Sequence, residues 1–168
     1  SDLLPDSDSM HYLKSADGIV AGAGLKNDSN IRAYQPPGYY YFLAGIRGTL
    51  GDDVLTIRGI QAILGAILCI LIYLALLQTG SLLAAVLGGL LASFSPTLIH
   101  YSAVIYSEVL FMPLCLLGLL LHLKSTKGRG SVALASLCGA VLGLAALTRE
   151  SALLILFGVA IAFAVRKR

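Results

Sequence analysis

The chain has 168 residues, of which 57% are hydrophobic and 12% are charged, and its mean hydropathy is +0.84. Soluble domains carry about 25% charged residues, so this composition excludes an ordinary soluble domain and favours a protein that lies in a membrane. The formal net charge of +3 says little by itself, because its distribution along the chain matters more. We predict no nucleic-acid partner.

Residues 1–58 form a polar segment that contains Pro and Tyr, and we predict that they are a loop outside the cytoplasm with helices on the membrane surface. The first of these helices falls within residues 7–22. It begins with residue types that favour a helix N-cap, Asp8 among them, and its apolar residues then recur with helical spacing. Tyr12 follows Asp8 by one turn. Spacing alone therefore favours Asp8 as a helix cap.

A second surface helix is predicted at residues 38–50, which are apolar but too short to span a membrane. The pair Pro36-Pro37 stops any preceding helix and is suited to start this one. Asp52 and Asp53 follow, immediately before the first long apolar run. A carboxylate pair can bind a metal ion, but adjacent acids at a helix start are usually caps that complement the helix dipole. We favour the cap.

From Gly59 to Val165 the sequence is almost wholly apolar and is interrupted only at short polar points. A helix needs roughly 20 apolar residues to cross a hydrocarbon core about 30 Å thick. We therefore predict five transmembrane helices, at residues 59–78, 82–100, 104–123, 131–148 and 151–166. The last is short for a full crossing, which fits truncation or tilt. The predicted fold is an all-α, polytopic helical membrane protein, with a loop at residues 1–58 and a transmembrane bundle at residues 59–168.

The charged residues predict an orientation for this bundle. The segment Lys124–Gly130 carries three basic residues and no acid, and Arg166–Arg168 carries three more, again without an acid. Because Lys and Arg are enriched in cytoplasmic loops, we predict that both segments are cytoplasmic. All nine acids then fall on the opposite side, together with residues 1–58. We expect an integral protein of the cell (inner) membrane with residues 1–58 extracytoplasmic.

Glu108 lies at the edge of the third predicted span and is followed by a long uncharged run. An ionisable group in this position is costly unless it faces water or has a partner, so it indicates a functional site by default. The alternative is a carboxylate that only faces water. Asp8, His11, His100 and Glu108 are residue types that bind divalent cations. No ligand spacing supports a metal site, and a metal requirement stays open.

Arg149 ends the fourth predicted span on the outer side, beside Glu150. One interpretation is a local ion pair between these neighbours, which contributes little at a surface. The other is a phosphate clamp, because the planar guanidinium of Arg can donate two hydrogen bonds to phosphate oxygens.

Four stretches occur in an order that is known from one family. They are Asp8-x-x-x-Tyr12-x-x-x-Ala16, Gln35-Pro-Pro-Gly-Tyr39 with Phe42-Leu-Ala44, Ser107-Glu108-Val-Leu-Phe111, and Gly143-Leu-Ala-Ala-Leu-Thr-Arg149. Together they resemble the membrane-embedded GT-C glycosyltransferases of the protein mannosyltransferase and aminoarabinose transferase type. The chain departs from the family pattern at three positions, where an acid, an Arg and a Pro are common; these are Ser9, Gln35 and Glu150.

The resemblance implies an enzyme that moves a sugar from a polyprenyl-phosphate donor to an acceptor at the outer membrane face, by direct displacement with inversion. It implies that Asp8 is the general base and that Glu108 orients the acceptor or shares a divalent metal ion with Asp8. The substrate-binding residues that it implies are Arg149, Arg32, Tyr12, Tyr39 and His100, with the two arginines at the donor phosphate. The implied partners are a lipid-linked sugar, membrane lipids and an acceptor that is a protein, a lipid or a glycan.

The chain begins at Ser1 in a polar segment and ends directly after a predicted span. We therefore expect an N-terminal fragment that lacks a preceding first span, and we expect these 168 residues alone to be inactive. Two functions of other classes stay open: a transporter or flippase, and a non-catalytic assembly subunit of the cell envelope. Transporters usually bind their substrates near the membrane midplane, whereas the acids here cluster at one edge, which favours the enzyme.

Overall fold

The computed structural model describes residues 7–25, 35–126 and 132–166, and within these ranges every regular element is an α-helix. The described helices, in chain order, are α1 (Ser7–Val20), α2 (Gly38–Leu50), α3 (Val54–Leu77), α4 (Leu82–Ser93), α5 (Pro96–Ala103), α6 (Glu108–Thr126), α7 (Val132–Thr148) and α8 (Ala152–Arg166). This confirms the prediction of an all-α protein.

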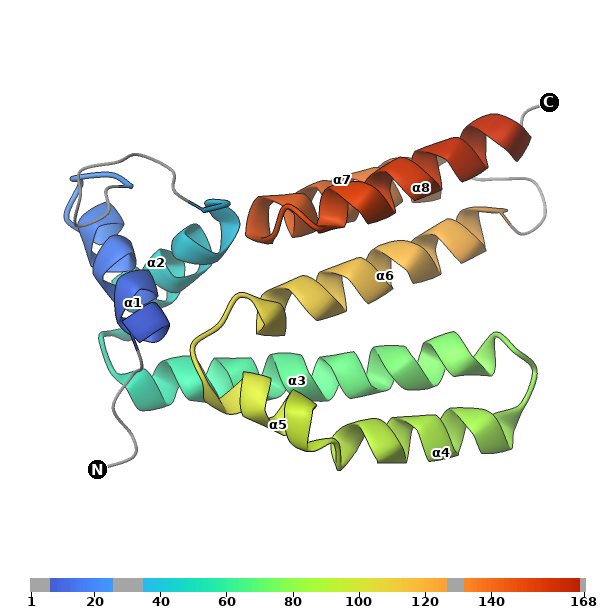
Figure 1. The fold of residues 1–168 in the computed structure, drawn as a ribbon, viewed down its shortest axis with the longest axis horizontal. Coiled ribbons are helices and arrows are strands. Elements are labelled where there is room, and N and C mark those ends of the chain that lie inside the picture. The colour runs from blue at the N-terminus through green and yellow to red at the C-terminus, as the bar shows by residue number, and fades with distance from the viewer. Residues whose placement is uncertain (1–6, 26–34, 127–131, 167–168) are drawn as a thin grey trace.

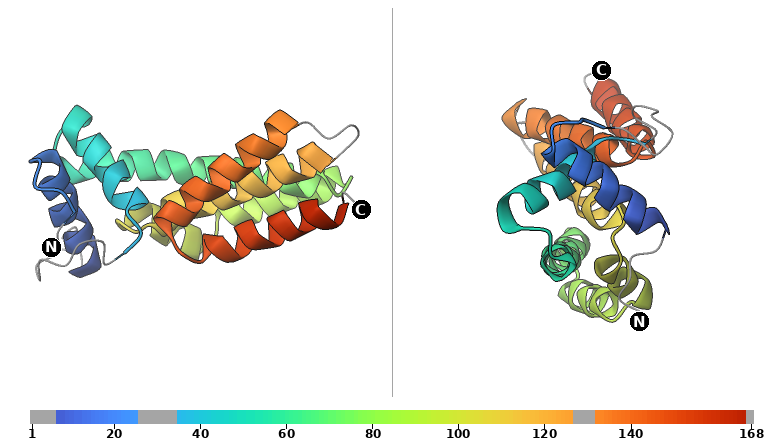
Figure 2. Two further views of the ribbon diagram at one scale, coloured as in Figure 1. Left: turned by 90° about the horizontal axis from the view of Figure 1, so that it is seen from above. Right: turned by 90° about the vertical axis from the view of Figure 1, so that its left-hand side faces the viewer.

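The longer helices run side by side, and the two N-terminal helices gather at one end of them (Figure 1). Helix α6 packs closely on α7, and α3 packs on α4 and α6. The views from above and from the end show α1 lying across the end of the bundle rather than along it (Figure 2). The α5–α6 connection and the α7–α8 turn lie at the same end as α1 and α2, whereas the α3–α4 turn and the C-terminal end of α8 lie at the other (Figure 1).

Two helices are long and apolar enough to cross a membrane, α3 with 24 residues and α6 with 19, among the residues that the structure describes. Helices α4 and α5 together would make a third, bent by 50° at the break between them. Helices α7 and α8 are shorter and apolar. The prediction of a polytopic helical membrane protein is therefore confirmed, while the crossing by all five predicted spans stays a prediction.

The largest differences from the predicted spans are at the start of α3, at the break between α4 and α5, and at the start of α6. Helix α3 begins at Val54, five residues earlier than residue 59, because the carboxylate of Asp53 accepts a hydrogen bond from the backbone N–H of Leu55 and caps the helix. The predicted span 82–100 is broken before Pro96, which lacks an N–H and occupies the first turn of α5. Helix α6 begins at Glu108 rather than at residue 104.

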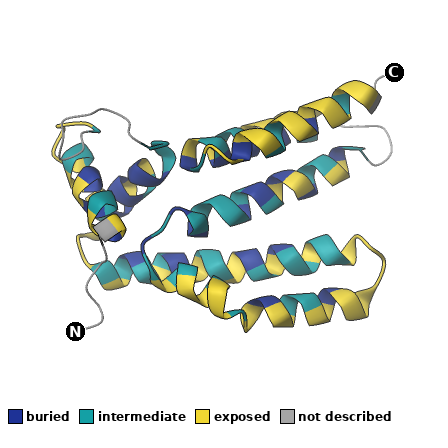
Figure 3. Cartoon of the chain, in the orientation of Figure 1, coloured by how far each residue is buried: buried dark blue, intermediate teal, exposed yellow. Residues whose placement is uncertain are grey.

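The helices of the bundle have exposed outer faces (Figure 3), and many large apolar side chains lie on them. Leu91, Val132 and Leu154 are each more than 70% exposed, at 73%, 81% and 78%. Exposed large apolar side chains along several helices would be unfavourable in water, but lipid tails can cover them, and a helix satisfies its own backbone hydrogen bonds in that environment. This surface is the one that an integral membrane protein presents to lipid.

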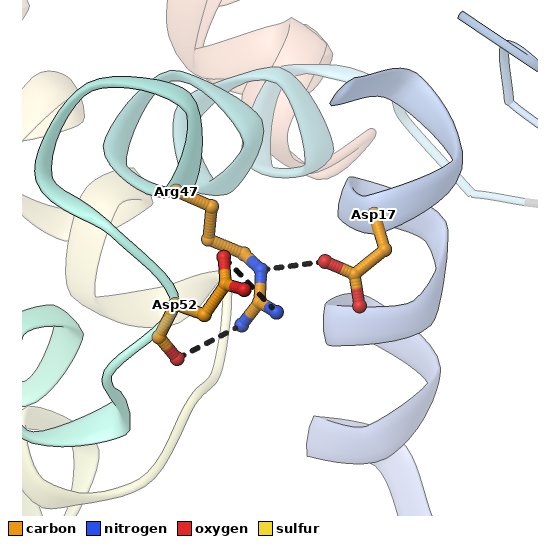
Figure 4. Close-up of polar contacts among 3 residues, drawn as sticks. All are labelled: Asp17, Arg47 and Asp52. Carbon is orange, nitrogen blue, oxygen red and sulfur yellow. Dashed lines mark hydrogen bonds and ion pairs between the residues drawn. The ribbon is translucent and has the colours of Figure 1, made fainter. Parts of the chain in front are cut away.

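Helices α1 and α2 pack on the end of the bundle through one buried apolar cluster, to which α1 contributes Leu13, α2 Leu43 and α3 Ile57. An ionic cluster supports this packing (Figure 4). The Nε of Arg47 in α2 donates to Asp17 of α1 at 2.7 Å, and its guanidinium lies 3.7 Å from the carboxylate of Asp52. Arg47 therefore links α1, α2 and the start of α3.

Candidate active site

A pocket of about 510 Å³ lies at the end of the bundle where α1 and α2 gather. Its wall comes from α1, the segment before α2, the α5–α6 region and the α7–α8 turn. The charged residues that line it are Asp8, Glu108, Arg149 and Glu150. Tyr12, Tyr101 and Tyr106 also line it. The pocket thus combines acids, one arginine and aromatic hydroxyls from segments that lie far apart in the sequence.

Glu108 and Arg149 form an ion pair across the pocket wall. The Nη1 of Arg149 donates to Oε1 of Glu108, although the two residues are 41 positions apart. Their side chains are 24% exposed for Glu108 and 40% for Arg149. The guanidinium carbon of Arg149 also lies 5.9 Å from the centre of the Phe111 ring. One of the two interpretations of Arg149 was a local pair with Glu150, but the structure pairs Arg149 with Glu108.

Ser107 and Tyr12 extend this network. The hydroxyl of Ser107 donates to Oε2 of Glu108 at 3.4 Å. Burial raises the pKa of Tyr12 above its usual 10.0, and the nearby charges of Glu108 and Asp8 raise it further, against a hydrogen bond with Ser107 and the charge of Arg149, which lower it. Tyr12 is therefore a neutral hydroxyl at physiological pH, able to donate a hydrogen bond into the pocket.

Asp8 lies in the first turn of α1, and its exposed side chain lines the pocket. The first turn of a helix is the position that the cap interpretation also predicts. The tertiary structure adds that this turn faces the same pocket as Glu108 and Arg149. An exposed carboxylate beside a pocket can accept a proton from a bound hydroxyl or amine.

Two of the other predicted substrate-binding residues lie away from the pocket. Tyr39 is fully buried beneath Tyr12, with ring centres 4.9 Å apart, and is not among the residues that line the pocket. His100 is exposed on α5, beside Tyr101, and does not line the pocket either. Arg32 lies outside the described residues.

Several pocket residues had no predicted role in the site. Tyr106 and Ser107 line the pocket because the α5–α6 connection turns there, directly before Glu108, and Tyr101 comes from the last turn of α5. Thr148 is contributed by the end of α7. For Tyr106, Ser107 and Thr148 the signal in the sequence was their position close to Glu108 or Arg149, but neighbours along a chain need not face the same way.

A metal site finds no support in the side chains that the structure describes, where no three His, Cys, Asp or Glu residues come together in a way that could hold an ion. Asp8 and Glu108 line one pocket, but Glu108 is paired with Arg149. The positive charge of Arg149 repels a metal cation at this carboxylate. His11 packs against Tyr40, with ring centres 6.0 Å apart. We therefore derive no step of chemistry from a bound metal.

These features define a class of protein: a helical integral membrane protein with a pocket lined by charged side chains at one end of the bundle. The family model described as dolichyl-phosphate-mannose-protein mannosyltransferase matches residues 34–168, and the chain belongs to this family. It is thus a membrane glycosyltransferase of the GT-C type. Comparisons with curated proteins and with solved structures give no match. The matched region contains Glu108 and Arg149 but not Asp8 or Tyr12, which enter the site through the packing of α1.

Proposed function

We propose that the protein transfers a sugar from a polyprenyl-phosphate donor to an acceptor at the outer membrane face, with inversion and with Asp8 as the general base. The observation that carries this proposal is the convergence of Asp8, Glu108 and Arg149 on one pocket from three separate parts of the chain. The family supports the class of reaction.

The chemistry needs a base, an electrophilic carbon and a stabilised leaving group. The acceptor hydroxyl or amine attacks the anomeric carbon of the sugar while its proton passes to the Asp8 carboxylate. The bond between that carbon and the phosphate oxygen breaks, and the lipid phosphate leaves with the electron pair. Arg149 stabilises the charge that develops on the phosphate, because its guanidinium matches phosphate oxygens. No bond to the enzyme forms in this single displacement, which inverts the anomeric centre.

Glu108 has the role of orienting the acceptor. Its carboxylate lines the pocket and accepts hydrogen bonds from Ser107 and Arg149, so its direction is fixed before substrate binds. Tyr12 is proposed to donate to a substrate oxygen, and Tyr39 supports the Tyr12 ring from beneath. Arg32 keeps its proposed role at the donor phosphate.

The orientation in the membrane is part of the same proposal. Residues 1–58 and the pocket would lie outside the cytoplasm, in the inner membrane of the cell, with Lys124–Gly130 on the cytoplasmic side. The lipid tail of the donor would lie against the exposed apolar helices, which reach the end of the bundle that holds the pocket. A mannose donor follows the description of the family, and an aminoarabinose donor is the second candidate from the resemblance. The acceptor is a protein, a lipid or a glycan.

A transporter or flippase, or a non-catalytic envelope subunit, would use this pocket differently. A transporter site is expected near the midplane, formed by broken helices. This pocket instead lies at one end of the bundle, where α1 contributes Asp8 and Tyr12 to its wall. Together with membership of a transferase family, its position favours catalysis.

The test is sugar transfer by membranes that contain the full-length protein, supplied with labelled polyprenyl-phosphate sugars. Asp8→Asn removes the base with little change in shape, and we expect transfer to fall by about a hundredfold or more, the usual contribution of a general base. Asp17→Asn is the matched control, because it makes the same change in the same helix at an exposed ion pair outside the pocket. Transfer by Asp8→Asn at the wild-type rate would refute the assignment. No transfer by the wild type from any donor would favour the transporter and the subunit.

A further inference from the structure

The short connection between α5 and α6 sets the position of Glu108 in the pocket. It comprises residues 104–107, contributes Tyr106 and Ser107 to the pocket wall, and leads directly into Glu108 at the start of α6. Because it is not part of a helix, its backbone is not held by a regular ladder of hydrogen bonds. Its path therefore depends on contacts from other segments.

Two side chains from distant parts of the sequence hold this connection. The Nε2 of Gln61 in α3 donates to the carbonyl oxygen of Val104 at 3.1 Å, and the hydroxyl of Ser9 in α1 donates to the carbonyl oxygen of Ile105 at 3.3 Å. Both Gln61 and Ser9 are 0% exposed. Two successive carbonyl groups of the connection thus accept hydrogen bonds from buried donors, one in α3 and one in α1.

Gln61 is an unusual residue for its place. It lies within α3, which is long and apolar enough to span the membrane, and its Oε1 is buried without a hydrogen-bond partner among the residues that the structure describes. Nε2 also donates to the hydroxyl of Tyr39 at 3.0 Å. A buried amide oxygen that has lost water without gaining a partner is unfavourable, and an apolar side chain of similar size would avoid that cost. Stability alone does not account for a glutamine here.

We propose that Gln61 and Ser9 are positioning residues, which hold the α5–α6 connection so that Glu108 and Ser107 face the pocket in the geometry that transfer requires. Ser9 is also a position where the chain departs from the family pattern, which often has an acid after the first Asp. A carboxylate has no proton to donate to the Ile105 carbonyl, whereas the serine hydroxyl has one. The effect on catalysis rests on the proposed function, but the hold on the connection does not.

The test compares Gln61→Leu and Ser9→Ala with two matched controls in the full-length protein. Gln78→Leu makes the same change at the exposed C-terminal end of α3. Ser125→Ala removes another buried hydroxyl, which donates within its own helix to the carbonyl of His122 at 2.8 Å. Four quantities are measured for each variant: kcat and KM for the labelled donor, hydrogen exchange of the peptide that covers residues 104–107, and the thermal unfolding midpoint.

For Gln61→Leu we expect kcat to fall about tenfold with the donor KM within about twofold, because a small misplacement near the reacting atoms slows the chemical step more than binding. Exchange in residues 104–107 becomes faster. The unfolding midpoint changes little, because the loss of the unpaired Oε1 offsets the loss of a donor by the Tyr39 hydroxyl and the Val104 carbonyl. Ser9→Ala behaves in the same direction, and both controls match the wild type.

Unchanged exchange in residues 104–107 in both site variants would overturn the proposal, whatever happens to activity. A fall in kcat that follows a fall in the unfolding midpoint would also overturn it, since it would show a merely structural role. If the wild type transfers no sugar, the proposed function fails on its own. The exchange measurement then still decides whether Gln61 and Ser9 hold the connection.

Discussion

At the scale of single residues, the charge of the pocket wall is set by the ion pair between Glu108 and Arg149, for which the sequence predicted two separate roles. Glu108 and Arg149 lie at the starts and ends of different helices, and each costs free energy at a membrane edge unless it has a partner. Their pairing offsets that cost. It also places the guanidinium at the pocket wall, where a donor phosphate would meet it.

Arg149→Lys keeps the positive charge but loses the planar fork that matches phosphate oxygens. We expect KM for the lipid-linked donor to rise about tenfold, which corresponds to about 1.4 kcal/mol of lost binding. Arg47→Lys is the matched control, because Arg47 pairs with acids outside the pocket. Initial rates over a range of donor concentrations measure the effect. Equal KM values for the two variants would exclude Arg149 as the phosphate ligand.

The raised pKa of Tyr40 predicts that the folded protein loses stability at alkaline pH. Burial raises the pKa of Tyr40 from 10.0 to about 12, and the neighbouring Tyr12 contributes in the same direction. Above pH 10 the unfolded chain loses this proton while the folded protein keeps it, so the folded state becomes less stable as pH rises toward 12. Unfolding midpoints between pH 8 and about 11 should fall less steeply for Tyr40→Phe than for the wild type. Parallel curves would show that Tyr40 does not contribute.

At the scale of helices, a close approach between α2 and α7 sets one wall of the site. A Cβ atom at Gly38 would lie 2.6 Å from the carbonyl oxygen of Leu147, just before the pocket residues Thr148 and Arg149. Only glycine allows the start of α2 to lie this close to the end of α7.

Gly38→Ala should therefore push α2 away from α7. We expect a loss of about 1–3 kcal/mol in the free energy of unfolding, as is usual for overpacking, together with lower sugar transfer. Gly45→Ala in the same helix is the control, because a Cβ there meets nothing within 4 Å and alanine favours a helix. Thermal unfolding and transfer are measured for both variants. A Gly38→Ala protein as stable and active as the control would show that α2 tolerates a shift.

At the scale of the whole molecule, the two ends of the bundle have different chemistry. The pocket, α1 and α2 occupy one end, and the α3–α4 turn occupies the other. If the protein spans the membrane as proposed, these ends face opposite compartments. The reaction then takes place outside the cytoplasm.

Single cysteines test this orientation after Cys69, Cys115 and Cys138 are replaced. Asp17→Cys in α1 should react with an impermeant thiol reagent added outside intact cells, whereas Thr79→Cys in the α3–α4 turn should react only after the membrane is opened. Both positions are exposed, so a difference in reaction reports the side of the membrane. The reverse pattern would invert the proposed topology.

Local pattern explains which parts of the fold could be predicted. Asp53 was expected to cap a helix, and it does, because capping involves only the next few residues. The second predicted span was placed at residues 82–100 as one helix, whereas the structure breaks it before Pro96. Asp8, Glu108 and Arg149 were named as site residues, and all three line the pocket. Their roles in catalysis stay predictions.

The sequence by itself determined the class of this protein. Long apolar runs can be buried in lipid only as helices, since a helix satisfies its own backbone, and the order of the motifs indicated a membrane transferase. The tertiary structure alone decided which charges meet. Glu108 pairs with Arg149 rather than Arg149 with Glu150, and Gln61 reaches the carbonyl of Val104, 43 residues away. Such contacts depend on how helices pack, and packing is set by side chains that local spacing does not bring together.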